Sequence, residues 1–404
     1  MPRLGSRVLL LGGDADLNVG DRAILSALTR CLTLHDPSVD ISVVGHPTLH
    51  ANLSGVAQVI PRGASGLRAL LRAAASADRV LIAGGGLFQD DDSRAKMPYW
   101  AARIGLLKSF NAHISALAIG AGPLAHPESR LSARIACAAL EHISVRDRFA
   151  RDALAGCTDR PLTIAPDPAF MLEPAPRDEA SAQLRRLGIP AGKPFIAATL
   201  RRWYHARGGL MPNGLKSRLG IEPKCDHARF DELLGVLARS LEALGQKLDA
   251  DIVLLPGYNT SLEADDAACE ALRWRMPGTR VHLARVADPG LYKALLGQAA
   301  LVISARMHPL ILAAGMGVPF VGLSYNGKFD GLYELLGLQA RSLPLDQCPD
   351  AWGVATLVAA AEAALEARVD LRQRAEALAA TVRSEAIDAA FGLNAPNALR
   401  VADA

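Results

Sequence analysis

The sequence lacks several features that would point to particular classes of protein. Its six cysteines, at positions 31, 137, 157, 225, 269 and 348, form no CxxC pair and show no zinc-ligand spacing. No apolar run reaches the length needed to cross a bilayer, and the N-terminal run Val8–Leu11 is too short for a signal peptide. We therefore expect a cytoplasmic protein with reduced thiols and no metal site. A peripheral contact with the inner face of the cytoplasmic membrane remains open.

The chain also has little excess charge of either sign. Its 404 residues include 44 Lys and Arg against 41 Asp and Glu, a net charge of +3. Nucleic-acid binding usually requires a concentrated basic surface, so we expect no nucleic-acid partner. Half of the residues are hydrophobic and 21% are charged, which is typical of a globular protein long enough for two domains.

Short apolar runs alternate with segments of helical character along most of the chain, a pattern typical of parallel α/β folds. The first half contains runs such as Arg7–Gly12, Arg79–Ala83 and Ile114–Ile119. The second half contains Phe195–Leu200 and Leu301–Ser304. The alternation predicts an α/β protein with one parallel sheet in each half.

A proline-rich stretch separates the two halves. Four prolines lie within residues 173–194, which we interpret as a linker. We expect an N-terminal α/β domain over residues 1–172 and a C-terminal α/β domain over residues 195–345. The alanine-rich segment 346–404 is expected to form a helix over Ala351–Ala390 that packs back on the N-terminal domain.

Three side chains that could bind an anion or transfer a proton follow two consecutive apolar runs. Arg306 and His308 come after Leu301–Ser304, and Lys328 comes after Val318–Leu323. Ligands of open α/β sheets bind at the carboxyl ends of the strands, where cations suit a small polyanion. Each residue has a plainer explanation, since Arg306 can pair with a carboxylate, His308 can begin a helix, and Lys328 can lie in solvent.

Further arginines follow other expected strands. Arg201 and Arg202 come after Phe195–Leu200, and because neighbouring side chains point in different directions, we expect one of them to face the site. Arg146 follows the expected strand His142–Val145 and is a candidate anion contact, whereas Asp147 is expected to cap the next helix.

Glycine-rich and polar loops follow strands of the first half. Their spacing is not GxGxxG, so they carry no dinucleotide fingerprint. Amide and carboxylate groups in such loops suit the hydroxyls of a sugar, although helix capping, with a capping box, and tight packing would explain them equally well. The candidate residues are Asn18, Asp21, Gly85, Gly86, Gln89 and Asp90.

Several of these stretches together resemble the polysaccharide pyruvyltransferases, and the CsaB-like branch is the most similar. The resemblance covers most of residues 7–340. It departs from the family at Pro309 and at a long basic insertion, residues 206–227, which is either a lid or a solvated loop. The motifs that carry the resemblance are Ala305–His308, Gly317–Pro319, Tyr325–Lys328, Asn18–Asp21, Gly84–Asp90 and Ile143–Asp147.

The resemblance implies a fold and a reaction. The fold is GT-B-like, with two Rossmann-like parallel-sheet domains facing across a cleft. The donor is phosphoenolpyruvate, no redox cofactor is needed, and the acceptor is a sugar or a lipid-linked oligosaccharide of a cell-surface polysaccharide or cell-wall polymer. His308 would transfer protons, assisted by Arg306 and Lys328.

The kinds of side chain divide the candidate residues between these two substrates, because a small polyanion suits cations and a neutral sugar suits acidic and amide groups. The donor would bind the C-terminal domain and the acceptor the N-terminal domain. The donor residues would be Arg201, Arg202, Arg306, His308 and Lys328, with Arg146, and the acceptor residues would be the six of the glycine-rich loops.

Two other functions fit the same pattern. A GT-B glycosyltransferase using a nucleotide-sugar would share the architecture, although Asp330 is the one acidic candidate we identify for a ribose contact in the second half. A non-catalytic sugar-phosphate-binding member of the family would be expected to lack Arg306 or His308, and both are present. The acceptor sugar and the oligomeric state are not specified.

Overall fold

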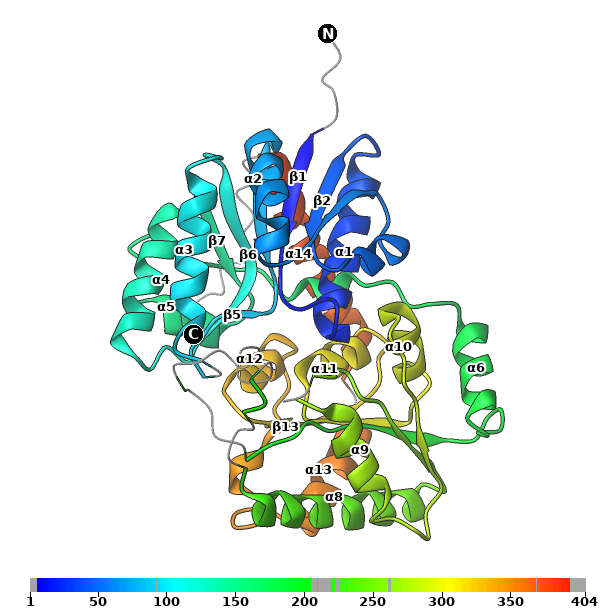
Figure 1. The fold of residues 1–404 in the computed structure, drawn as a ribbon. Helices are drawn as coiled ribbons and strands as arrows, with labels where there is room; N and C mark the ends of the chain where they lie inside the picture. The colour runs from blue at the N-terminus through cyan, green and yellow to red at the C-terminus, as the bar shows by residue number, and fades with distance from the viewer. Residues whose placement is uncertain are drawn as a thin grey trace. The chain divides into compact units, whose positions relative to one another are not determined.

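The computed structural model describes residues 6–91, 93–204, 209, 219–221, 225–260, 263–367 and 369–392. Most of the basic insertion over 206–227 lies outside these residues. The chain divides into two compact units. The first comprises residues 1–172, 207–219 and 377–404, and the second comprises residues 173–206 and 220–376 (Figure 1).

The first unit is a parallel sheet with helices packed on it. Its strands are short apolar runs, and all eight residues of the strand Ile114–Ala121 are buried, as expected for a parallel strand covered on both faces. The elements are β1 (Arg7–Leu11), α1 (Val19–His35), β2 (Asp40–Val44), β3 (Val56–Ile60), α2 (Leu67–Ser76), β4 (Arg79–Ala83), β5 (Gly86–Phe88), α3 (Lys96–Lys108), β6 (Ile114–Ala121), α4 (Pro127–Ala139), β7 (His142–Val145), α5 (Arg148–Leu154) and β8 (Thr163–Ile164). The strand order is β3-β2-β1-β4-β6-β7-β8, and β5 pairs with β6.

The pattern of apolar runs did not predict two strands of this unit. β3 lies at the edge of the sheet, and its central residues are exposed or half-exposed, so it lacks a continuous apolar run. β5 has three residues and begins within the glycine run at Gly86. The apolar pattern detects strands that are covered on both faces and misses those that are short or peripheral.

The second unit is a separate parallel sheet with its own core. Its elements are α6 (Arg177–Arg186), β9 (Phe195–Thr199), α8 (His227–Lys247), β10 (Asp251–Leu254), α9 (Asp265–Arg273), β11 (Val281–Leu283), α10 (Pro289–Leu296), β12 (Leu301–Ser304), α11 (Met307–Ala314), β13 (Phe320–Ser324), α12 (Lys328–Leu335), β14 (Leu343–Pro344), α13 (Val354–Glu366) and α14 (Leu371–Phe391). The strand order is β11-β10-β9-β12-β13-β14. The predicted class, an α/β protein with two parallel sheets, is confirmed.

Several boundaries in this unit differ from those expected. The alanine-rich C-terminal segment forms two helices, α13 and α14, instead of one helix over Ala351–Ala390. The expectation missed α12, which begins at Lys328, and the two-residue strand β14. Among the described residues, no helix has both the length and the hydrophobicity of a membrane span.

Helix α14 begins in the second unit and, from residue 377 on, belongs to the first. Within the first unit, His142 Nε2 on β7 donates to the Glu385 carboxylate at 2.6 Å. This hydrogen bond raises the pKa of His142 above its ordinary value, although burial opposes the shift. Burial alone would raise the pKa of Glu385, but His142 lowers it below its ordinary value. We therefore expect the contribution of this pair to the attachment of α14 to depend on pH.

We expect the substitution Glu385→Gln to destabilise the first unit in a pH-dependent manner. The contribution of His142 is present below its unfolded pKa of 6.5 and is lost as pH rises through the raised folded value. The contribution of Glu385 is present above its unfolded pKa of 4.5 and is lost as pH falls through the lowered folded value. The loss of stability should therefore be largest between the two unfolded pKa values, 4.5 and 6.5.

The measurement is urea unfolding of both proteins at about pH 5.5 and at about pH 9. Because the His142 side chain is 42% exposed, the difference at the lower pH should be about 0.5–1 kcal/mol, and it should shrink at the higher pH. Glu376→Gln is a control, since its partner Arg372 does not titrate in this range. An equal loss of unfolding free energy at both pH values would show that the His142–Glu385 pair does not cause the destabilisation.

Candidate functional site

Strand register brings two arginines of the second unit to one edge of the sheet. β12 lies between β9 and β13, with Ser304 opposite both Thr199 and Gly322. Arg201 and Arg306 each follow their strand by two residues beyond the aligned pair Thr199 and Ser304. Because the strands are parallel, their carboxyl ends meet at the same edge.

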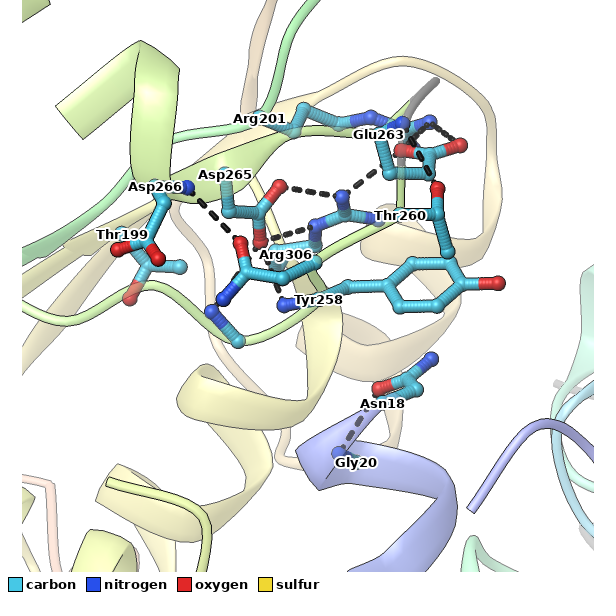
Figure 2. Close-up of polar contacts among 12 residues, drawn as sticks. Asn18, Gly20, Thr199, Arg201, Tyr258, Thr260, Glu263, Asp265, Asp266 and Arg306 are labelled. Carbon is cyan, nitrogen blue, oxygen red and sulfur yellow. Dashed lines mark hydrogen bonds and ion pairs between the residues drawn. The ribbon is translucent and has the colours of Figure 1, made fainter. Parts of the chain in front are cut away.

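Both arginines form ion pairs with carboxylates. Arg201 Nη2 donates to both carboxylate oxygens of Glu263, at 3.0 and 2.9 Å. Arg306 Nη2 donates to Glu263 at 2.8 Å and to Asp265 at 2.5 Å, and its Nε donates to Asp265 at 3.1 Å (Figure 2). These four residues, which we call the arginine–carboxylate cluster, have two positive and two negative side chains.

Asp265 is the most deeply buried member of the cluster. Besides the Arg306 bonds, it accepts backbone N–H groups from Gly257 and Tyr258, at 3.2 and 2.9 Å. Burial by itself would lower the pKa of Arg306, but the charges of Asp265 and Glu263 outweigh it and hold that pKa well above its usual range. Arg306 is therefore held both in charge and in position.

The sequence pattern did not identify Glu263 or Asp265 as site residues. Helix α9 begins at Asp265, and Ala264 before it has a left-handed conformation with φ of 39°. This turn directs both carboxylates to the arginines, and a left-handed alanine has no signal in the sequence. The one available clue was an acid-rich segment soon after a strand.

The acidic residues of the second unit bear on the nucleotide-sugar alternative. Asp330 was the one acidic candidate for a ribose contact in this half. In the structure Asp330 is exposed and accepts a hydrogen bond from Ser342 at 3.0 Å. Glu263 and Asp265 lie at the edge of the sheet and form ion pairs with Arg201 and Arg306. The presence or absence of an acidic group here therefore does not separate the two enzyme classes.

Tyr325 links Lys328 to the arginine–carboxylate cluster. Lys328 Nζ donates to the Tyr325 hydroxyl and lies 4.1 Å from the centroid of its ring. The guanidinium carbon of Arg201 also lies 4.1 Å from that centroid, and Trp203 packs against the ring at 5.2 Å. Burial alone would raise the pKa of Tyr325, but Lys328, Arg201 and Arg306 outweigh it and lower that pKa. The sequence placed Tyr325 in a family-like motif but did not identify it as a site residue.

His308 lies in the first turn of α11, which begins at Met307. Pro309 is in the same first turn, where its missing N–H is tolerated. The Ser304 hydroxyl accepts the backbone N–H of Arg306 at 2.9 Å and fixes the turn into this helix. His308 and Arg202 are both partly buried. His308 follows Arg306 by two residues along the chain.

In the first unit, Asn18 and Asp21 bond to the protein's own loop. Asn18 Oδ1 accepts the N–H of Gly20 at 2.9 Å, which confirms it as the cap of α1. Asp21 accepts from the backbone N–H of Asp14 at 2.8 Å and from Asn18 Nδ2 at 3.1 Å. The reciprocal bond of a capping box, from the Asn18 N–H to Asp21, is replaced by these contacts. A Cβ on Gly85 would lie 3.0 Å from the Asp21 carboxylate.

Other polar candidates of the first unit are also buried. Asp90 accepts the backbone N–H groups of Ala125 and His126, at 3.1 and 2.9 Å. Gln89 is buried, and its side-chain oxygen would lie 2.6 Å from a Cβ on Gly86, so a larger residue there would require the Gln89 side chain to move. These contacts give Gln89, Asp90 and Gly86 a structural role, and their binding of an acceptor stays a prediction.

Arg146 is the candidate cation of the first unit. It is buried and pairs with Asp147 at 3.0 Å and with Asp167 at 3.6 Å. Asp147 also accepts the N–H of Ala150 at 2.7 Å, which confirms it as the cap of α5. Within the described part of the chain, no group of three or more His, Cys, Asp or Glu side chains could hold a metal ion.

The family model for polysaccharide pyruvyl transferases matches residues 18–327. Because this match covers most of the chain, the protein belongs to that family. No curated protein matches the sequence. The match spans both units and includes the residues of the arginine–carboxylate cluster.

Solved structures of similar fold are sugar-nucleotide enzymes. A putative UDP-N-acetylglucosamine 2-epimerase from Listeria monocytogenes has a TM-score of 0.56 and 15% identity, over 96% of this chain and 94% of that one. The UDP-GlcNAc 2-epimerase of Methanocaldococcus jannaschii has a TM-score of 0.58 and 11% identity, over 94% and 99%. The UDP-GlcNAc 2-epimerase from Neisseria meningitidis bound to UDP-GlcNAc has a TM-score of 0.54 and 11% identity, over 95% of this chain and 99% of that one. At these identities the likeness shows the GT-B-like fold alone.

We expect Asp265→Asn to destabilise the second unit strongly. Removing one charge from a buried, multiply bonded pair leaves Arg306 partly uncompensated, which typically costs about 3 kcal/mol or more. For a unit of this size, that lowers the melting temperature by roughly 6–12 °C. Thermal unfolding measures the shift, with Asp330→Asn as an exposed control. Equal melting temperatures of the two variants would contradict the role assigned to Asp265.

Proposed function

Because the chain belongs to the polysaccharide pyruvyl transferase family, we propose that it transfers the pyruvyl group of phosphoenolpyruvate to two hydroxyls of a sugar, forming a cyclic ketal. The observation that carries the proposal is that Arg201, Arg306 and Lys328 lie at the ends of three adjacent parallel strands. A carboxylate and a phosphate on one small molecule require several cations held apart, and arginine suits both groups.

The donor would bind through N–H groups that the carboxylates leave available. Arg201 Nε is buried and makes no hydrogen bond with any described residue, so an anionic oxygen would satisfy it. Helices α11 and α12 begin at the same edge of the sheet, and their first N–H groups and dipoles favour an anion. Lys328 adds a further positive charge beside Tyr325.

In this proposal, proton transfer is shared between two side chains. His308 protonates the methylene carbon of the donor, which becomes a methyl group and leaves the central carbon electrophilic. The first sugar hydroxyl bonds to that carbon and gives its proton to Tyr325, whose phenolate Lys328 stabilises. The carbon–oxygen bond to phosphate then breaks. The second hydroxyl closes the ring, and its proton leaves on the departing phosphate.

The acceptor is proposed to be a sugar, free or lipid-linked, that belongs to a cell-surface or cell-wall polymer assembled in the cytoplasm. The strand-end loops of the first unit are assigned to it. Because Asp21 and Asp90 already accept backbone N–H groups, we assign the sugar contacts to the backbone around Gly85 and Gly86 and to Gln89. Neither step needs a redox cofactor.

The direct test is incubation of the purified protein with phosphoenolpyruvate and a panel of free and lipid-linked sugars. The expected result is release of inorganic phosphate together with a sugar product that has gained one pyruvyl ketal, detected by mass spectrometry and NMR. A parallel panel of nucleotide-sugars tests the glycosyltransferase alternative. Release of a nucleoside diphosphate with no phosphoenolpyruvate consumption would overturn the proposal.

The substitution His308→Ala should leave a folded protein with almost no turnover. Loss of a general acid typically lowers the rate by about a hundredfold to ten-thousandfold. Phosphate release measures kcat, circular dichroism checks folding, and His227→Ala on the exposed start of α8 is the matched control. Turnover equal to that of the control would remove His308 from the mechanism.

Lys328→Met and Tyr325→Phe should separate donor binding from proton transfer. Lys328→Met removes a charge-assisted contact and should raise KM for phosphoenolpyruvate roughly tenfold or more, and it should also lower kcat because the Tyr325 phenolate loses its neighbouring charge. Tyr325→Phe keeps the ring against Arg201 and the nearby charges, so KM should stay within about threefold while kcat falls by at least about a hundredfold. Lys193→Met, which breaks a pair with Asp249, is the control. An unchanged kcat in Tyr325→Phe would assign the base role elsewhere.

A further inference from the structure

Three consecutive helices cover the same face of the first unit's sheet. Helix α2 connects β3 to β4, α3 lies between β4 and β6, and α4 connects β6 to β7. Each crossover advances in the same direction along the strand order, and such connections are right-handed, so the three helices lie on one face (Figure 1). Helices α3 and α4 pack against each other, and all three helices have outward sides on this face.

The charges of these helices are almost all positive. The helices contain one acidic residue, Glu128, which is paired with Arg94. The three helices carry seven basic residues and one acidic residue, whereas the whole chain has a net charge of only +3. The rest of the chain is therefore net negative. The basic residues of the three helices are Arg68, Arg72, Lys96, Arg103, Lys108, Arg130 and Arg134.

The same face exposes large apolar side chains. Six of the eleven exposed large hydrophobic residues in the described part of the chain lie on these helices or directly after α3, and each is 40–59% exposed. Three of them recur at spacings that place them on one side of α3, where Arg103 donates to the Tyr99 hydroxyl at 2.7 Å. The six are Leu67, Tyr99, Leu106, Phe110, Leu131 and Ile135.

We propose that this basic apolar face, formed by the outward sides of α2, α3 and α4, docks on an anionic lipid membrane. A membrane interface accepts aromatic and aliphatic side chains into its outer layer and attracts lysine and arginine to its headgroups. The two kinds of residue are interleaved on this face, as that environment requires. The protein would then be peripheral, held on the surface without a spanning helix.

Charge distinguishes this occupant from a second copy of the chain. Two such faces in contact would place like charges opposite each other, which disfavours self-association. Nucleic acid would neutralise the arginines and lysines, but its phosphates do not take up aliphatic side chains such as Leu131 and Ile135. An anionic membrane satisfies both the charge and the apolar area.

The inference does not depend on the proposed reaction, since docking is measured without substrate. The experiment is co-sedimentation of the 404-residue protein with vesicles of pure phosphatidylcholine and with vesicles containing phosphatidylglycerol. We expect binding to the anionic vesicles that is at least about tenfold tighter than to the neutral ones and that weakens as salt is raised.

Two double variants test the two components of the face. Arg68→Gln with Arg72→Gln removes two exposed charges on α2 and should weaken anionic-vesicle binding roughly tenfold or more. Leu131→Gln with Ile135→Gln removes exposed apolar area from α4 and should also weaken it roughly tenfold. Glutamine is a good helix former, so both variants should fold, as circular dichroism will check.

Matched controls carry the same changes elsewhere. Arg185→Gln with Arg186→Gln removes two exposed charges from α6, and Leu34→Gln with Trp274→Gln removes exposed apolar side chains outside this face. The controls should bind vesicles as the wild type does. The proposal is wrong if the wild type ignores lipid composition, or if the face variants bind as well as the controls. Retention on a soluble acidic protein without vesicle binding would identify a protein partner instead.

Discussion

The second unit depends on a buried balance of charge between two arginines and two carboxylates. Arg201 and Arg306 share Glu263, and Arg306 is held on its other side by Asp265. Separating such charges from water is costly unless each is paired and hydrogen-bonded, and here the pairing is provided by a single loop. The cluster thereby fixes the ends of β9 and β12 relative to the start of α9.

This charge balance determines what the two arginines can offer to an anion at this edge of the sheet. Both arginines are paired with carboxylates, and Lys328 lies beside them against Tyr325. The paired arginines contribute rigid N–H groups whose positions are set before any ligand arrives. Such preorganisation lowers the cost of ordering the site on binding.

The first unit uses its glycines differently from a nucleotide-binding loop. The space that glycine leaves open is filled by the protein's own side chains, with the Asp21 carboxylate against Gly13 and Gly85 and the Arg146 guanidinium against Gly120. Polar loops at strand ends are thus tied to the sheet by internal bonds. The groups left for a ligand are those of the backbone as much as those of the side chains.

The sequence by itself determined the fold class and the strand ends that matter. Apolar runs buried on both faces, such as β9 and β12, are continuous in the sequence, so the residue pattern alone places Arg201 and Arg306 at strand ends on one edge. Only the tertiary structure decided which partners those arginines have. Glu263 and Asp265 lie about forty to sixty residues from them along the chain, and the left-handed turn at Ala264 that delivers them has no residue signature. Long-range pairing and backbone handedness are set by packing, which no local pattern records.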